Sequence, residues 1–342
     1  MSITFKELAE ICGVSRATVD RVIHNRGKVA PEVEQRIREA AEQYGFRPNQ
    51  VGKALARARN PIKIGVLVHL SRIEFFQELL EGIYAGQKEV AALGGEVIIK
   101  EQRDFDAEGQ MRLLNELISE GVNGIALSPA QSSHLCDRLN TLSRSGIPVV
   151  TYNTELEGLE NLCHVGVDNV QGGRMGAYLM SLLLRGNGGK VLVISGHRMQ
   201  QSNYQRVDGF QMECASLFQN IETAAIKMNA DEEKQAYDIT MATVREIPDL
   251  AGIYMVSNGQ EGTCRALEDC GMAGKIQLIA CDLVPVTRKY LEKGVIQFVI
   301  DQDAHSQGSM PSKILFDYLF SEKKPSSDRI IGQFGIKTRY NL

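Results

Sequence analysis

Residues 13–29 have the sequence GVSRATVDRVIHNRGKV, in which a glycine-containing turn is followed by a short helical pattern. Ser15 stands where a helix N-cap is expected, and Thr18 follows three residues later. A second helical pattern, FKELAEIC, lies before the turn at 5–12, and a third, PEVEQRIREAAEQYG, lies after it at 31–45. Two helices joined by a tight turn, with a third that completes a small core, predict an all-α helix-turn-helix unit.

The charge of the chain is divided unevenly. The formal net charge of the 342 residues is −4, but residues 1–60 hold 11 Lys and Arg against 7 Asp and Glu, a balance of +4. The remainder of the chain therefore carries −8. A basic first segment on an acidic body is expected when one end of a protein contacts a polyanion and the rest does not.

Residues 47–61, RPNQVGKALARARNP, predict a linker. Asn49 is placed to cap a brief helix that Pro61 ends, and the apolar residues of this helix share one face. A helix this short is too weak to form alone in water, so we expect it to fold only against another surface.

From Pro61 onward, apolar runs alternate with amphipathic stretches such as FFQELLEGIYAGQKEVAAL. Nine of these runs predict strands: IKIGVLV, GEVIIK, VNGIALS, IPVVTYN, GKVLVIS, IETAAIKM, LAGIYMVSN, IQLIACD and VIQFVID. Continuous Val and Ile runs between helices indicate parallel sheets covered on both faces. This number of strands is large for a single open sheet, so the body is predicted to consist of two doubly wound α/β lobes. A small-ligand cleft is expected at the carboxyl ends of their strands.

The composition, 43% hydrophobic and 23% charged, is typical of a folded globular protein. No apolar run is long enough to span a bilayer, and MSITFKELAE reaches charged residues before a signal core could form. The seven cysteines are scattered without CxxC spacing, which indicates reduced thiols rather than disulfides or a zinc site. We therefore expect a cytoplasmic protein that needs no metal and no cofactor.

The order of features at the start of the chain resembles the DNA-binding head of the LacI/GalR family of bacterial transcription regulators. The resemblance rests on the GVS turn, the TVDRV pattern, the VAPEVEQRIREAAEQYG segment, and RPN ahead of a linker that ends in LA. It extends over the body as the type I periplasmic-binding-protein fold, with strand ends similar to those of ribose-binding proteins. It implies a helix-turn-helix head at 1–47, a hinge helix at 48–60, and an effector-binding and dimerisation body at 61–342, with an N-lobe of about 61–163 and 297–323 and a C-lobe of about 164–296 and 324–342.

The resemblance also implies which head residues contact DNA. Arg16 and Ala17 would face base edges in the major groove, with Arg21 one helical turn further on. Arginine can bond the acceptors of guanine, and alanine can touch a thymine methyl. Contacts that position the helix on phosphates are implied for Thr4, Ser15, Thr18 and Asn25, and Asn49 joins this DNA-binding set from the hinge helix. The alternative for the arginines is that they are solvated charges on a surface helix.

Two positions of the second helix depart from the family pattern, which usually has serine where this chain has Asp20 and asparagine where it has His24. Both residues stay in the predicted DNA-binding set, but their phosphate contacts are in doubt. Asp20 either bonds Arg16 or Arg21, or accepts from a cytosine amine, or is a tolerated acid at the rim of the helix.

The linker resemblance implies that two hinge helices, one from each subunit, pack together in the minor groove with Leu55 as a wedge between base steps. The alternative for Leu55 is burial against the body. A homodimer follows, because one head contacts too few base pairs to discriminate and two heads match a palindromic operator. The predicted partners are therefore double-stranded operator DNA, a small effector and a second copy of the chain, with no membrane.

Aromatic and polar residues near strand ends predict the ligand site, because sugar recognition needs a flat apolar surface and side chains that bond several hydroxyls. By resemblance to ribose-binding proteins, the predicted ligand residues are Phe75, Phe76, Asn153, Arg206, Tyr237, Asn258, Asp282 and Gln302. Sugar-binding relatives often have Asp-Arg where this chain has Asn153 and Thr154. The alternatives are core packing for a phenylalanine and a turn cap for an Asn or Asp. Asp168 is predicted to cap the next helix.

These features together predict a sequence-specific transcription regulator, a repressor without enzymatic activity, whose operator affinity is controlled by a monosaccharide or polyol. The alternatives are a solute receptor for sugar transport, a regulator that responds to a nucleoside-type ligand, and a nucleotide-dependent enzyme. The basic head and the lack of a signal pattern disfavour the receptor. The lack of a nucleophile elbow, a metal pair and a complete phosphate loop disfavours the enzyme.

Overall fold

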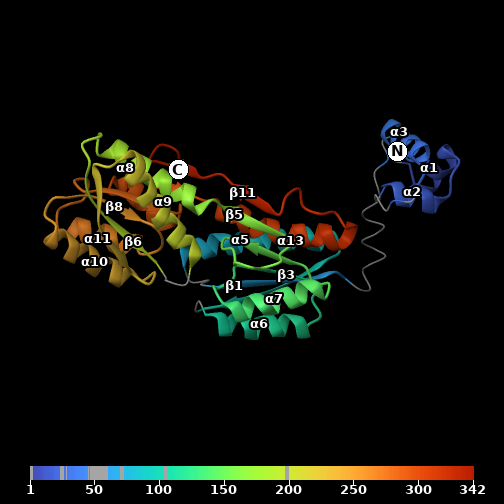
Figure 1. Ribbon diagram of the computed structural model, residues 1–342, viewed down its shortest axis with the longest axis horizontal. Helices are drawn as coiled ribbons and strands as arrows, with labels where there is room; N and C mark the ends of the chain where they lie inside the picture. Colours follow the sequence, from blue (N-terminus) through green and yellow to red (C-terminus); the bar gives the residue numbers. More distant parts are fainter. Residues whose placement is uncertain are drawn as a thin grey trace.

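The head consists of three helices, α1 (Phe5–Cys12), α2 (Arg16–Ile23) and α3 (Pro31–Gln43), which form a group of their own in Figure 1. Thr4 caps α1 in a reciprocal pair of hydrogen bonds with Glu7. Gly13 ends α1 at φ 61°, a left-handed conformation that glycine adopts without a Cβ clash. The Oγ of Ser15 accepts from the Thr18 amide at 3.1 Å, so the predicted cap of α2 is confirmed.

The computed structural model describes residues 3–342 except 24–26, 28, 45, 47–60, 70–72, 104, 105 and 197–199. The predicted hinge helix lies outside the described residues, and so do His24, Asn25, Asn49 and Leu55.

Two six-stranded sheets form the body. Sheet A has the strand order β11 (Arg329–Gly332), β5 (Cys163–Val167), β4 (Val149–Tyr152), β3 (Gly124–Leu127), β1 (Lys63–His69), β2 (Glu96–Gln102). Sheet B has the order β12 (Gly335–Lys337), β10 (Phe298–Asp301), β9 (Gln277–Cys281), β8 (Leu250–Met255), β6 (Gly189–Ser195), β7 (Ile221–Met228). All pairs are parallel except that of β10 with β12. The two sheets thus repeat one doubly wound order, and all nine predicted strands are confirmed.

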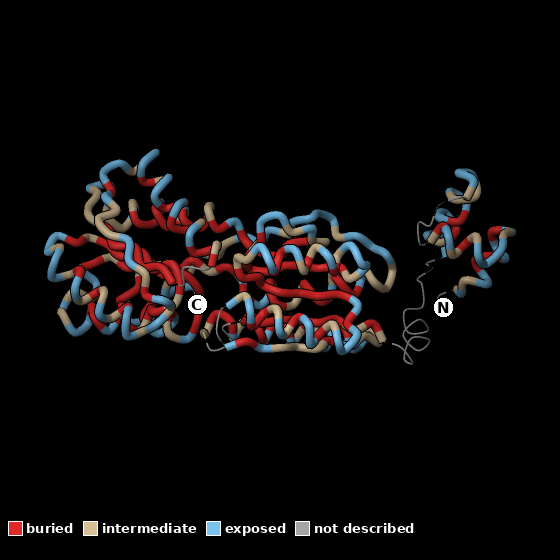
Figure 2. Tube along the Cα trace, turned by 60° about the horizontal axis from the view of Figure 1, so that its bottom comes forward, coloured by how far each residue is buried: buried red, intermediate tan, exposed pale blue. Residues whose placement is uncertain are grey.

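Helices cover both faces of each sheet (Figure 1). Those of the sheet A lobe are α5 (Glu74–Ala92), α6 (Ala107–Ser119), α7 (Ser133–Arg144) and α13 (Ala304–Ser321). Those of the sheet B lobe are α8 (Asn169–Leu183), α9 (Gln201–Leu217), α10 (Glu233–Glu246), α11 (Gln260–Asp269) and α12 (Pro285–Lys293). Each lobe has two apolar clusters, one on each side of its sheet. The buried strands therefore run through the middle of each lobe in Figure 2, as expected for parallel sheets.

The chain passes between the lobes three times: from β5 to α8, from β10 to α13, and from β11 to β12. The lobe boundaries in the structure therefore differ from the predicted ones. Residues 164–167 and 329–332 pair within sheet A rather than with the C-lobe, and 298–301 pair with β9 in sheet B rather than with the N-lobe. The physical reason is that β5 pairs with β4 in sheet A and β10 pairs with β9 in sheet B. The chain leaves each lobe only after that strand is paired.

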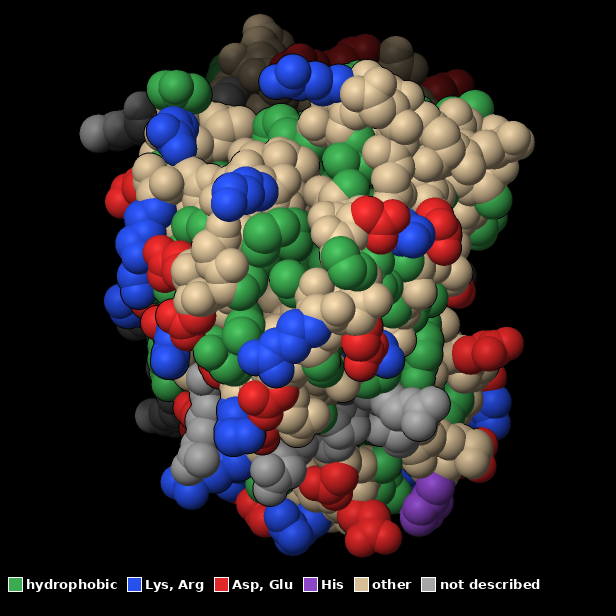
Figure 3. Space-filling model, turned by 90° about the vertical axis from the view of Figure 1, so that its left-hand side faces the viewer, with side chains coloured by type: hydrophobic (Ala, Val, Ile, Leu, Met, Phe, Trp, Pro, Cys, Tyr) green, Lys and Arg blue, Asp and Glu red, His purple; other side chains and the backbone are tan. Residues whose placement is uncertain are grey.

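The outer end of the sheet B lobe is shown in Figure 3, where acidic and basic side chains are mixed over the surface.

Candidate functional site

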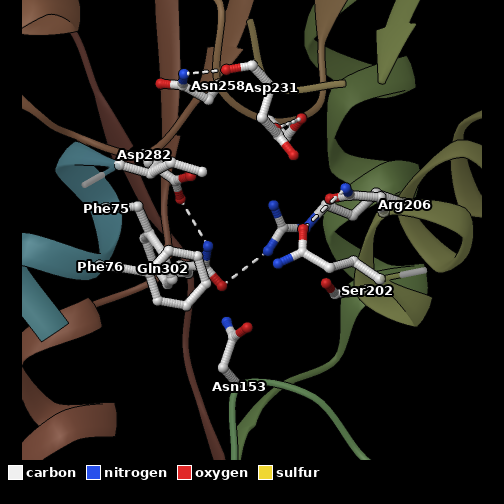
Figure 4. A pocket seen from close by; sticks show the side chains of 13 residues that line it. Phe75, Phe76, Asn153, Ser202, Arg206, Asp231, Asn258, Asp282 and Gln302 are labelled. Atoms are coloured by element: carbon white, nitrogen blue, oxygen red, sulfur yellow. Dashed lines mark hydrogen bonds between the residues drawn. The ribbon is translucent and has the colours of Figure 1, made fainter. Parts of the chain in front are cut away.

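A pocket lies between the two lobes at the carboxyl ends of their strands, where ligands of doubly wound sheets bind. It encloses about 340 Å³, counting the space at its mouth. Its lining residues are Ile73, Phe75, Phe76, Asn153, Gln200, Ser202, Asn203, Arg206, Asp231, Ser257, Asn258, Asp282 and Gln302. The structure therefore brings seven of the eight predicted ligand residues to one place (Figure 4).

Arg206 is the centre of the hydrogen-bond network of the pocket. Its side chain is 4% exposed, and each of its three nitrogens has an acceptor. The Nε donates to Asn169 Oδ1 at 3.0 Å, Nη1 to the carbonyl of Val256 at 3.1 Å, and Nη2 to Gln302 Oε1 at 2.8 Å. Gln302 Nε2 in turn donates to Asp282 Oδ1 at 2.6 Å. The guanidinium is thus held by acceptors from three segments: the start of α8, the residue after β8, and the crossing from β10 to α13.

Asp282 is buried at the end of β9. Burial raises the pKa of its carboxyl to about 6, against the opposing effects of the Arg206 guanidinium and the Gln302 amide. Asp282 and Asn153 follow equivalent strands of the two sheets, and both have positive φ, 71° and 59°. Asn and Asp tolerate this conformation better than other residues with a side chain, so the turns account for part of their identity. Both side chains nevertheless line the pocket.

Phe75 and Phe76 begin α5 and form the apolar wall of the pocket on the sheet A side. Their rings meet edge to face, with centroids 5.0 Å apart, and Phe76 also contacts the ring of His69. Both are buried in the core cluster of the lobe. Core packing and pocket lining are therefore not alternatives here, because the same rings do both.

Tyr237 is the predicted ligand residue that the structure does not bring to the pocket. Its hydroxyl donates to Asp269 Oδ2 at 2.9 Å, and the Arg265 guanidinium lies 5.9 Å from its ring centroid. It lies in the second turn of α10, and its side chain is directed to α11. The reason it does not reach the cleft is therefore the direction of its side chain, which packs against the neighbouring helix.

Six lining residues were not predicted from the sequence: Ile73, Gln200, Ser202, Asn203, Asp231 and Ser257. Asp231 and Ser257 follow β7 and β8 by only a few residues, so the strand-end rule that identified Asn258 could have found them. Ser202 and Asn203 lie in the first turn of α9, one turn before Arg206, and that helical spacing is the signal for them.

The exposed face of α2 is the second candidate site. Val19 and Val22 are buried in the core of the head, whereas Arg16, Ala17 and Arg21 are exposed and Asp20 is half-buried. Residues at positions i, i+1, i+4 and i+5 share one face of a helix, so these four lie together on the side away from the core.

Three further observations bear on the predicted chemistry. Asp168 Oδ1 accepts from the Gln171 amide at 3.0 Å, so its predicted role as a helix cap is confirmed. Among the described residues, no group of three or more His, Cys, Asp or Glu side chains is arranged to hold a metal ion. Within that same part of the chain, no helix is both long enough and apolar enough to cross a bilayer.

The pH dependence of stability should report on Glu78, a half-buried residue of α5. Burial, with the neighbouring carboxylates of Asp301, Asp282 and Asp303, raises its pKa to about 7. An unfolded glutamate has a pKa of about 4.3, so the folded protein binds a proton that the unfolded chain releases, and stability falls as pH rises through this window. We expect Glu78→Gln to raise the melting temperature of the body by a few degrees at pH 8 and to leave it nearly unchanged at pH 5.

Differential scanning calorimetry at the two pH values measures this effect. Glu292→Gln, on the exposed side of α12, is the control and should change neither melting temperature. Equal shifts at pH 5 and pH 8 for Glu78→Gln would contradict a titrating carboxyl at this position.

Comparison with known proteins finds matches for both the body and the head of the chain. Residues 64–323 match the periplasmic binding protein domain family, and residues 4–49 match the bacterial regulatory proteins of the lacI family. Catabolite control protein A of Priestia megaterium is 28% identical over 172 residues, which are 50% of this chain and 49% of that protein, so the match spans about half the length of this relative. The ribose operon repressor of Halalkalibacterium halodurans is 23% identical over 94% of this chain and 91% of its own length.

Solved structures agree on the fold of the body. A solute-binding protein of an ABC transporter from Burkholderia graminis, in complex with D-arabinose, superposes with a TM-score of 0.76 at 24% identity, over 82% of this chain and 96% of its own. The family match covers most of the chain, and the match at 4–49 adds the helical head. The chain belongs to the periplasmic binding protein domain family, which its residues 64–323 match, and it has at 4–49 an N-terminal domain that matches the bacterial regulatory proteins of the lacI family.

Proposed function

We propose that this protein is a sequence-specific repressor of transcription whose affinity for operator DNA is controlled by a monosaccharide or polyol bound between the lobes. The observation that carries the proposal is the pocket around Arg206, a polar network built at the meeting point of two lobes in a chain that also has a lacI-type head. We propose no catalytic role for it.

The chemistry of the pocket supports a ligand of this class. The phenylalanine wall suits the apolar face of a sugar ring, and the amides and carboxylates opposite suit its hydroxyls. The relatives point the same way, since one is a ribose operon repressor and one solved structure holds D-arabinose.

The DNA-binding part of the proposal rests on the exposed face of α2. Arg16, Ala17 and Arg21 would contact base edges, while Thr4, Ser15 and Thr18 would contact phosphates beside the helix-capping bonds that they make. His24, Asn25, Asn49 and Leu55 belong to the proposal through the family resemblance. It also includes a homodimer, because two heads are needed to match a palindromic operator, and the cytoplasm as the place where the operator lies.

Ligand binding would act on DNA through closure of the lobes. Three crossings join the lobes, and Gln302 lies in the one from β10 to α13, hydrogen-bonded to both Arg206 and Asp282. A ligand that favours one degree of closure would change the relative position of the two heads in a dimer. The coupling is reciprocal, so operator DNA would alter affinity for the ligand by the same factor.

Thermal unfolding with a panel of pentoses, hexoses, polyols and nucleosides tests the proposal. A ligand that binds only the folded state at 100 times its Kd adds about 2.7 kcal/mol of stability, so the sugar or polyol that fits should raise the melting temperature clearly. The same compound should change the affinity for operator DNA in a fluorescence anisotropy titration. A response to nucleosides, with none to sugars or polyols, would overturn the proposed ligand class and leave the DNA-binding function standing.

A further inference from the structure

Asp231 is a pocket residue whose backbone is held in an uncommon conformation. It follows β7 and has φ 62°, and Ala230 before it has φ 50°. Two successive residues with side chains in the left-handed region are costly and persist only where the surroundings hold them. Asn229 provides part of that support, because its Oδ1 accepts from the Asp231 amide at 3.2 Å and its own amide donates to the Ser195 carbonyl at 2.9 Å.

The side chain of Asp231 is also positioned by its neighbours. Ser257 Oγ donates to Asp231 Oδ1 at 2.8 Å, and Asn258 Nδ2 donates to the Asp231 carbonyl at 2.7 Å. Gly196 leaves the space that the carboxylate occupies, since a Cβ there would lie 2.1 Å from Asp231 Oδ1 and 2.2 Å from Ser257 Oγ. Segments that follow three strands of sheet B therefore fix one carboxylate, which points into the pocket in Figure 4.

The two walls of the pocket differ in chemistry. The sheet A wall is mostly apolar, with Ile73, Phe75 and Phe76 and the single amide of Asn153. Among the described lining residues, the sheet B wall has no aromatic side chain, and Tyr237 does not take that place. Asp231 stands on the sheet B wall instead. A ligand stacked on the phenylalanines would turn its opposite side toward a carboxylate.

We propose that Asp231 determines the ligand specificity of this protein by accepting a hydrogen bond from one particular hydroxyl of the bound sugar. A carboxylate has about four acceptor positions, so Asp231 can accept from more than one donor at a time, and Ser257 is one of these donors. A site built to bond a hydroxyl rejects an analogue that lacks it, because the polar group of the site is left without its partner. This inference rests on the proposed function, since it specifies how that same pocket selects among sugars.

Isothermal titration of the full-length protein tests the inference, with D-ribose, D-arabinose, D-allose and the singly deoxygenated analogue of each as probes. Asp231→Asn keeps the shape of the side chain and an oxygen for Ser257, but it replaces one acceptor with a donor. We expect it to weaken binding of the best parent sugar by about 10- to 100-fold, as for loss of a hydrogen bond to a charged group. For the one deoxy analogue that lacks the contacting hydroxyl, wild type and Asp231→Asn should bind equally.

Two further variants separate the direct contact from a structural effect. Gly196→Ala leaves Asp231 unchanged but displaces its carboxylate, so it should reproduce the loss and the same pattern among the analogues. Asp168→Asn, the same exchange at a helix cap outside the pocket, should bind all probes as wild type does. Equal losses for Asp231→Asn on every parent and every analogue, or no loss at all, would overturn the inference. If wild type binds none of the probes, the proposed sugar class fails and the inference fails with it, a result distinguishable from failure of Asp231 alone.

Discussion

Replacing Arg206 with alanine is expected to lower the free energy of unfolding of the body by roughly 3–5 kcal/mol and to abolish its thermal response to sugar. The buried guanidinium donates to three acceptors, so its loss leaves the oxygens of Asn169 and Gln302 and the carbonyl of Val256 without this partner. It also removes the charge that opposes the rise in the pKa of Asp282. Urea unfolding, with and without the best sugar of the panel, measures both effects.

Two other variants make this result specific to the position. Arg144→Ala removes an exposed arginine at the end of α7 that pairs with the exposed Glu160, and such surface pairs contribute about 0–1 kcal/mol, so both stability and sugar response should be kept. Arg206→Lys keeps a positive charge but not the planar fork, and should recover part of the stability without the sugar response. A sugar response in Arg206→Ala equal to that of wild type would remove Arg206 from the proposed site.

Many of the strands that the sequence predicts have a pattern decided by burial. Runs such as IKIGVLV and GKVLVIS are buried along almost their whole length, so burial selects apolar β-branched residues there. The strands that escaped prediction are short edge or near-edge elements. β11 has four residues and is mostly exposed, and β12 has three residues, none of them buried. β5 contains His164, a buried polar residue whose Nδ1 lies 3.0 Å from Thr151 Oγ1. Local sequence does not encode such tertiary pairing.

The residues of the pocket were predictable where they follow a strand. Asn258 and Asp282 were found because parallel strands bring their carboxyl ends to one edge, which makes a polar residue after a strand informative. The prediction that Tyr237 lines the pocket was wrong, because the direction of a side chain on a helix depends on which neighbouring helix it packs against. The same rule applies to Asp231, which follows β7 by three residues, but the positive φ of Ala230 and Asp231 is not marked by a glycine and could not be predicted.

Replacing Arg16 with alanine is expected to weaken binding to the operator by about 10- to 100-fold, the effect of losing a bidentate contact to guanine, and to weaken binding to random DNA much less. Arg16 begins α2 and is exposed on the face that carries Ala17 and Arg21, opposite the buried Val19 and Val22. Removal of an arginine that contacts bases mainly weakens binding to the operator. Removal of an arginine that contacts only phosphate weakens binding to operator and random DNA alike. The operator for this test is the sequence selected by wild type from a random DNA pool, and fluorescence anisotropy at fixed salt measures both affinities.

Arg38→Ala is the matched control, because it removes the same charge from the same small domain. Arg38 lies on α3 rather than on α2, and it pairs with Glu34 at 2.7 Å. Its loss changes the long-range attraction of the head for phosphate, which acts on every DNA sequence, so the ratio of operator to random affinity should stay that of wild type. If Arg16→Ala also leaves that ratio unchanged, the exposed face of α2 positions the head without reading bases, and specificity must come from other residues.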